Sequence, residues 1–134
     1  FGTYNQKFKP NRTEADWLCS DAQALDDYLA DPLVRKNISA GLFRELLGSM
    51  KRSGHTASYA GWNKEMPVLL LYGTDDPVGD SGKGVPQLYG LMKKAGLQAV
   101  DCQQFPSARH DIFHEEANGT AESVRSALTK WIGR

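Results

Sequence analysis

The sequence lacks an excess of charge of either sign, a long apolar run and more than two cysteines. Sixteen Lys and Arg residues balance sixteen Asp and Glu residues over 134 positions. This balance provides no basic footprint for nucleic acid or for an anionic membrane surface. No segment approaches the roughly 18 consecutive apolar residues of a membrane-spanning helix, and no charged-then-apolar leader is seen. We therefore expect a cytoplasmic globular protein with no nucleic-acid partner and no membrane span.

Cysteine and histidine are too few and too scattered to predict a metal site. Cys19 and Cys102 are far apart and match no metal or redox spacing, so two free thiols are expected. His110 and His114 have the i, i+4 spacing of a helical metal pair, but their segment is loop-like and lacks the glutamate of a zinc-protease motif. We expect no metal and no other cofactor.

The first half of the chain predicts short helices and loops. Residues 1–10 are rich in Lys, Asn, Gln and Pro and predict an irregular arm. Side chains that can cap a helix precede apolar residues at two places: Thr13 (with Asp16 three residues on) and Asp21. The helix after Asp21 is expected to end at Asp31-Pro32, because the residue before a proline disfavours the α region. Residues 52–64 show no sustained period and predict a loop.

The helix predicted over residues 39–51 carries a wide apolar stripe. Its members are Leu42, Phe43, Leu46, Leu47 and Met50. A stripe of this width most often packs against a protein core.

From Met66 onward, strand and helix patterns alternate. Residues 67–72 form a continuous apolar run that Gly73 ends, which is typical of a strand covered on both faces. The further predicted elements are a helix over 82–95 closed by Gly96, a strand over 98–105, a loop over 106–118 and a helix over 120–132. A crossover of this length implies a parallel pair of strands. Because parallel sheets are normally several strands wide, half of the sheet is expected to be missing from this sequence.

An acid and a histidine stand just past the ends of the two predicted strands. Asp76 lies in Gly73-Thr74-Asp75-Asp76-Pro77, and His110 ends Ala108-Arg109-His110. In open α/β sheets, reactive groups collect beyond the carboxyl ends of the strands. A serine hydroxyl becomes a good nucleophile when an imidazole accepts its proton, and a carboxylate fixes the imidazole tautomer. The order acid then histidine is the order found in α/β-hydrolases.

Other residues in these loops are weaker candidates for the acid. Asp75 and Asp80 could serve as turn or cap residues, since Asp favours such positions, and Asp80 is placed to cap the following helix. Asp76 itself could be a turn residue, and His110 could be an ordinary loop histidine.

The chain resembles the C-terminal half of a serine α/β-hydrolase, in the group of monoacylglycerol lipases, bacterial lysophospholipase-like proteins and serine aminopeptidase-type enzymes. The segments that carry the resemblance are residues 67–80, 82–85 and 105–110, with 12–18 and Asp31-Pro32. The resemblance covers nearly the whole chain and implies an α/β protein with a partial α/β-hydrolase fold. Residues 1–64 would be cap or lid helices with a connecting loop, and residues 65–134 the C-terminal βαβα unit of the core.

The resemblance implies a serine ester hydrolase in which Asp76 and His110 are the catalytic acid and base. The family's nucleophile lies in a Gly-x-Ser-x-Gly turn, which does not occur in these 134 residues. The serine is therefore expected in a missing N-terminal half, the partner that completes the enzyme, and this chain alone should be inactive. The implied substrate is a small acyl ester of the monoacylglycerol or lysophospholipid type. The chain begins at Phe1 without a methionine, as a proteolytic or truncated product would.

Alternatives remain at this point. Cap helices of this family also roof the acyl pocket, so Leu42, Phe43 and Leu46 could line the substrate site rather than pack in a core. A peptidase or an acyltransferase could use the same triad. A non-catalytic α/β-hydrolase-like binding protein is the rival from another class. The intact acid and histidine loops argue against the binding protein, and the residue at the nucleophile turn would decide: serine for the enzyme, alanine or glycine for the binder.

Overall fold

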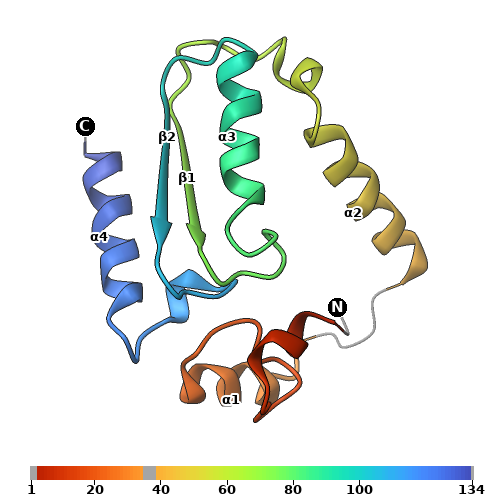
Figure 1. Ribbon diagram of the computed structural model, residues 1–134, viewed down its shortest axis with the longest axis vertical. Coiled ribbons are helices and arrows are strands. Elements are labelled where there is room, and N and C mark those ends of the chain that lie inside the picture. The colour runs from red at the N-terminus through yellow and green to blue at the C-terminus, as the bar shows by residue number, and fades with distance from the viewer. Residues whose placement is uncertain (1–2, 35–38, 134) are drawn as a thin grey trace.

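The computed structural model describes residues 3–34 and 39–133 (Figure 1). In chain order its elements are the 3-10 helix η1 (Tyr4–Phe8), α1 (Ala22–Ala30), α2 (Ala40–Ser53), η2 (Thr56–Tyr59), β1 (Val68–Gly73), α3 (Gly84–Lys94), β2 (Val100–Phe105), η3 (Ile112–His114) and α4 (Thr120–Ile132). Residues 1–2, 35–38 and 134 lie outside this description, and the division of the chain at residue 64 stays a prediction.

The two strands form the predicted parallel pair. Their register runs from Val68 opposite Val100 to Gly73 opposite Phe105. The helices α3 and α4 cover opposite sides of the pair (Figure 1). Because successive residues of a strand point to opposite faces, Leu70 packs in the cluster beneath α3 and Leu71 in the cluster beneath α4. Helices that cover both faces, and partly bury Leu70 and Leu71, explain the unbroken apolar run of β1.

The core of this unit consists of two clusters, one on each side of the sheet. The cluster beneath α3 contains Tyr59, Met92, Leu97 and Val100. The cluster beneath α4 contains Phe105, Ala108, Ile112 and Val124. The first cluster shows that residues 52–64 are not entirely loop, since Tyr59 of η2 is buried there and its hydroxyl donates to the Ser53 carbonyl at 2.6 Å. The cluster beneath α4 packs the loop after β2 against α4. This loop carries His110.

Residues 3–34, called here the N-terminal segment, lie beyond the carboxyl ends of β1 and β2 (Figure 1). The segment has a small core of its own, made of Ala15, Cys19 and Leu25. Two predictions about the segment were wrong. The arm predicted as irregular contains η1, and Thr13 starts no helix.

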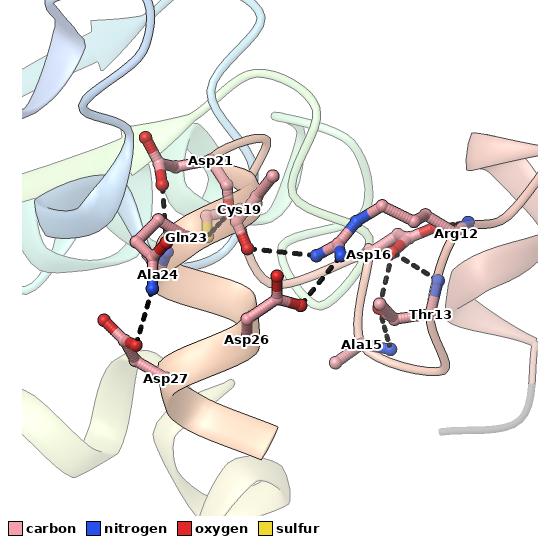
Figure 2. Close-up of polar contacts among 11 residues, drawn as sticks. Arg12, Thr13, Ala15, Asp16, Cys19, Asp21, Gln23, Ala24, Asp26 and Asp27 are labelled. Atoms are coloured by element: carbon pink, nitrogen blue, oxygen red, sulfur yellow. Dashed lines mark hydrogen bonds and ion pairs between the residues drawn. The ribbon is translucent and has the colours of Figure 1, made fainter. Parts of the chain in front are cut away.

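The polar contacts around Asp16 explain why a turn forms where a helix was predicted. The Asp16 carboxylate reaches back and accepts hydrogen bonds from the backbone N–H groups of Arg12 at 2.7 Å and Thr13 at 2.9 Å (Figure 2). The Thr13 hydroxyl accepts from the Ala15 N–H at 3.1 Å. The side chains therefore close residues 14–18 into consecutive turns, because they compete with the helical pattern for backbone donors.

The predicted cap at Asp21 is confirmed, and the structure adds a cap at Ser39. The Asp21 carboxylate accepts from the Ala24 N–H at 2.9 Å (Figure 2). The helix α1 ends directly before Asp31-Pro32. The Ser39 hydroxyl accepts from the Leu42 N–H at 3.1 Å at the start of α2.

Asp80 does not cap α3, contrary to prediction. The helix begins at Gly84 behind Lys83, and no side chain caps it. Residues 80–82 have φ angles of 51°, 51° and 84°. This left-handed backbone cannot belong to a right-handed helix, so the turn continues to Lys83.

The helix α2 stands apart, with α3 between it and β1 (Figure 1). Its apolar stripe is exposed over its whole length, from 38% for Phe43 to 60% for Leu42. The prediction that the stripe packs in the core is therefore wrong for the described chain. The cluster beneath α3 contains Tyr59 of η2, whereas no described residue of α2 is buried. No helix within residues 3–34 and 39–133 is long and apolar enough to cross a membrane.

Candidate active site

The loops after β1 and β2 contact each other where they leave the strands. A Cβ atom on Gly73 would stand 2.2 Å from the carbonyl oxygen of Ala108, so only glycine allows this approach. The Asp75 N–H donates to that same carbonyl at 2.9 Å. The Ser107 N–H donates to the Thr74 hydroxyl oxygen at 2.8 Å. These hydrogen bonds hold together two loops that are distant in sequence.

The contact between these loops brings Asp76 and His110 together. Asp76 Oδ2 and His110 Nδ1 are 3.0 Å apart, and Asp76 Oδ1 accepts from the Val78 N–H at 2.8 Å. An ionised carboxylate can only accept, so Nδ1 carries the shared proton and Nε2 is the nitrogen that can exchange one with a reactant. The side chain of Asp76 is mostly buried, whereas that of His110 is 41% exposed. The carboxylate therefore orients an imidazole ring that remains partly exposed.

The pKa values of both groups move in the direction that favours an ion pair. Burial raises the pKa of Asp76, but the hydrogen bond and charge of His110 and the N–H groups of Val78 and Gly79 together hold it below its usual value. The hydrogen bond that His110 donates to Asp76 raises the pKa of His110, burial opposes this, and the charges of Asp76 and Asp111 add to the rise. The imidazolium that forms when His110 accepts a proton is therefore stabilised.

The His110 ring also lies against the N-terminal segment. Its centroid is 5.3 Å from that of the Trp17 ring, with 37° between the planes, and Trp17 in turn lies 5.4 Å from Tyr4. No role was predicted for Trp17. Its place in residues 12–18, a segment that carries the family resemblance, was the available signal.

A buried carboxylate, Glu115, was also missed. It is completely buried and bonds to both Arg109 and Ser20. An acid in a loop rich in charged residues has no distinguishing local pattern, so no sequence signal marked it.

The remaining candidates do not reach the pair. The Asp75 carboxylate instead forms an ion pair with Lys7 at 3.0 Å. His114 Nδ1 is 2.8 Å from Asp111 Oδ2. Leu42, Phe43 and Leu46 belong to α2, which Figure 1 shows on the far side of α3 from β2.

The described residues contain no group of three or more His, Cys, Asp and Glu side chains that could hold a metal ion. The expectation of a cofactor-free protein remains a prediction. Both cysteines are free thiols, Cys19 buried and Cys102 exposed. Burial is the main reason that the pKa of Cys19 is raised to about 11.

A cavity of about 540 Å³ lies beside α1 and is lined by residues of the N-terminal segment together with Asp111, His114 and Glu116. Neither Asp76 nor His110 lines it, so this cavity is separate from the Asp76–His110 pair.

The chain is similar to a known protein family and to a solved structure. Residues 1–117 match the model of a family described as serine aminopeptidase, S33. No curated protein matches the chain. Among solved structures, a highly thermostable carboxyl esterase from Bacillus coagulans, in complex with glycerol, matches with a TM-score of 0.78 and 21% identity. The match covers 98% of this chain and 43% of the esterase chain, so this chain spans less than half the esterase's length.

The esterase likeness shows a shared fold: the parallel pair, its two covering helices and the preceding helices form part of an α/β-hydrolase fold. The family match extends over most of the sequence, including both loops that carry Asp76 and His110. The chain therefore belongs to the serine aminopeptidase S33 family of α/β-hydrolases.

Proposed function

We propose that this chain supplies the acid and the base of a serine ester hydrolase. The carrying observation is the 3.0 Å contact between Asp76 Oδ2 and His110 Nδ1, beyond the carboxyl ends of adjacent parallel strands. Asp76 is the orienting acid and His110 the general base. The nucleophilic serine belongs to a segment outside this sequence, the N-terminal half of the fold, and the chain alone is inactive.

The proposed reaction follows the usual two steps of a triad enzyme. The serine oxygen bonds to the acyl carbon while His110 Nε2 takes the hydroxyl proton, and the imidazolium then gives this proton to the departing alcohol. Water next attacks the acyl-enzyme while His110 takes a proton from this water. The acid leaves and the proton returns to the serine. Asp76 stabilises the imidazolium in both steps.

The proposed substrate is a small acyl ester of the monoacylglycerol or lysophospholipid type, which makes the enzyme lipase-like or lysophospholipase-like. The supporting observation is the exposed apolar stripe of α2, whose Leu42, Phe43 and Leu46 would contact an acyl chain in the complete fold. A cytoplasmic location without a cofactor or a nucleic-acid partner completes the proposal.

A peptidase, or an acyltransferase, on the same triad is the second candidate, because the matching family is described as a serine aminopeptidase. A panel of acyl esters and aminoacyl anilides distinguishes the ester hydrolase from the peptidase. Turnover of the esters alone supports the ester hydrolase, and turnover of the anilides alone supports the peptidase. A non-catalytic binding protein would turn over neither.

The test of the acid uses the intact hydrolase, that is, this chain joined to the segment that carries the serine. Asp76→Asn is expected to lower kcat by about 10⁴-fold, because the asparagine no longer holds the required imidazole tautomer. Asp75→Asn is the matched control, since the Asp75 side chain points to Lys7, and it should leave kcat nearly unchanged.

The same design applies to the base. His110→Ala should abolish turnover, while His114→Ala, at an exposed histidine that pairs with Asp111, should not. Near-normal turnover by Asp76→Asn or His110→Ala would reject the proposal.

A further inference from the structure

Glu115 lies five residues after His110, and its carboxylate joins the histidine loop to the N-terminal segment. Its Oε1 accepts from the Arg109 N–H at 2.9 Å. Its Oε2 accepts from the Ser20 N–H at 3.1 Å and also from the Ser20 hydroxyl. Burying a carboxylate is costly unless it is hydrogen-bonded, and here both oxygens are bonded. Both buried oxygens are therefore satisfied by donors from two separate segments.

The Arg109 side chain reinforces the same junction. Its guanidinium donates to the carbonyl oxygens of Asp16 and Cys19, the second at 3.1 Å, and lies 4.2 Å from the Phe8 ring centroid. The residue directly before His110 is therefore held by its backbone to Glu115 and by its side chain to the N-terminal segment.

The backbone of His110 and Asp111 continues this contact. The His110 N–H donates to the Trp17 carbonyl at 3.5 Å, and the Asp111 N–H donates to the Leu18 carbonyl at 2.7 Å. Behind the loop, the Glu115 carbonyl accepts from the Ala121 N–H at 3.0 Å, in the first turn of α4. Glu115 is thus fixed on the side of α4 as well, and it cannot shift without moving the loop.

We infer that Glu115 is a positioning residue for His110: its buried carboxylate, bonded to Arg109 and Ser20, keeps Nδ1 within hydrogen-bond distance of Asp76. The inference rests on the proposed function, in which His110 is the base. Asp76 is held by its own turn through the Val78 N–H. The geometry of the pair therefore depends on the loop that carries His110, and a displacement near 1 Å can lower a rate by about 10²-fold.

A displaced His110 has a signature that a loss of stability lacks. Asp76 and Asp111 both raise the pKa of His110, and the hydrogen bond to Asp76 is the largest cause. If the loop shifts, this bond weakens while the protein stays folded, and the pKa of His110 falls toward its ordinary value. The acid limb of kcat/KM then moves to lower pH.

The test is Glu115→Gln in the intact hydrolase. Glutamine keeps the size of the side chain but replaces one acceptor oxygen with an NH₂ donor, which cannot accept from Arg109 or Ser20. We expect kcat to fall by about 10²-fold with KM nearly unchanged. We also expect the acid limb of kcat/KM, and the His110 ring titration followed by NMR, to move to lower pH. Ser20→Ala removes only the hydroxyl donor and should cause a smaller change in the same direction.

Glu116→Gln is the matched control, because Glu116 is exposed and pairs with Arg125 at 2.8 Å. It should leave kcat and the acid limb unchanged. A folded Glu115→Gln protein with normal kcat, or with a lower kcat but an unmoved acid limb, would overturn the positioning role. If Glu115→Gln does not fold, a Ser20→Ala protein with normal kcat and an unmoved acid limb would overturn it instead. Failure of the proposed function is a separate result, since His110→Ala would then remain active.

Discussion

The N-terminal segment and α2 were both predicted as parts of a cap, yet they are held in different ways. The N-terminal segment has its own buried core and bonds to the histidine loop through Arg109, Asp111 and Glu115. The helix α2 has the wider apolar stripe, but that stripe is exposed throughout. An apolar stripe alone therefore does not indicate which part of the chain supports the Asp76–His110 pair. Polar contacts to the loop that carries His110 indicate it.

The largest expected difference between the two regions is in thiol reactivity. In a Cys102→Ser background, Cys19 should react with a thiol reagent more than about 10³-fold more slowly than a cysteine placed on α2 by Leu46→Cys. Cys19 is only 3% exposed and its pKa is raised to about 11, whereas Leu46 is 44% exposed. The measurement is the labelling rate at neutral pH. Similar rates for the two thiols would show that the N-terminal segment opens readily.

A smaller difference is expected in stability. Leu25→Ala removes a buried side chain from the core of the N-terminal segment and should lower the free energy of unfolding by about 2–5 kcal/mol. Leu46→Ala on α2 should change it by less than about 0.5 kcal/mol, because the side chain is already exposed. Urea unfolding of the intact hydrolase measures both values. An equal loss from Leu46→Ala would mean that the stripe is covered in the complete protein.

The smallest expected difference is in pH dependence. The folded-state pKa of His110 is raised, so its contribution to stability is fully present below its unfolded value near 6.5 and is lost as pH rises through the folded value. The folded-state pKa of Asp76 is lowered from 3.8, so its contribution is present above that value and is lost as pH falls through the folded value. Stability from the pair should therefore be greatest between these two reference values.

Amide hydrogen exchange can locate this pH effect. The protection factor of the Asp111 N–H, which bonds to Leu18, should decrease as pH rises above 6.5, while protection factors within α2 should stay constant. His110→Gln should remove the pH dependence at Asp111. A parallel change in α2 would indicate a global effect rather than one centred on the pair.

Much of the α/β unit follows from local sequence. The apolar run of residues 67–72, its end at Gly73 and the side-chain periods of the flanking helices predicted β1, β2, α3 and α4. The positions of Asp76 and His110 beyond the strand ends follow from the parallel pairing. These predictions succeeded because strand burial, helix periodicity and glycine conformations act over a few neighbouring residues.

The predictions were wrong where a local pattern is compatible with more than one structure. The Thr13–Asp16 pattern suits a helix start as well as the observed turn, and only the backbone donors that Asp16 reaches decide between them. The apolar period of α2 is equally compatible with a core, a substrate pocket or an exposed surface.

The sequence alone thus determines β1, α3, β2 and α4 and puts Asp76 and His110 just past the two strand ends, because both depend on short-range pattern and on the direction of the strands. The surroundings of the pair emerge only on folding. Ser20 and Glu115 are 95 positions apart, and their hydrogen bond depends on packing between segments that share no sequence pattern. A carboxylate such as Glu115 is marked by complete burial with satisfied hydrogen bonds, and burial is a property of the folded chain.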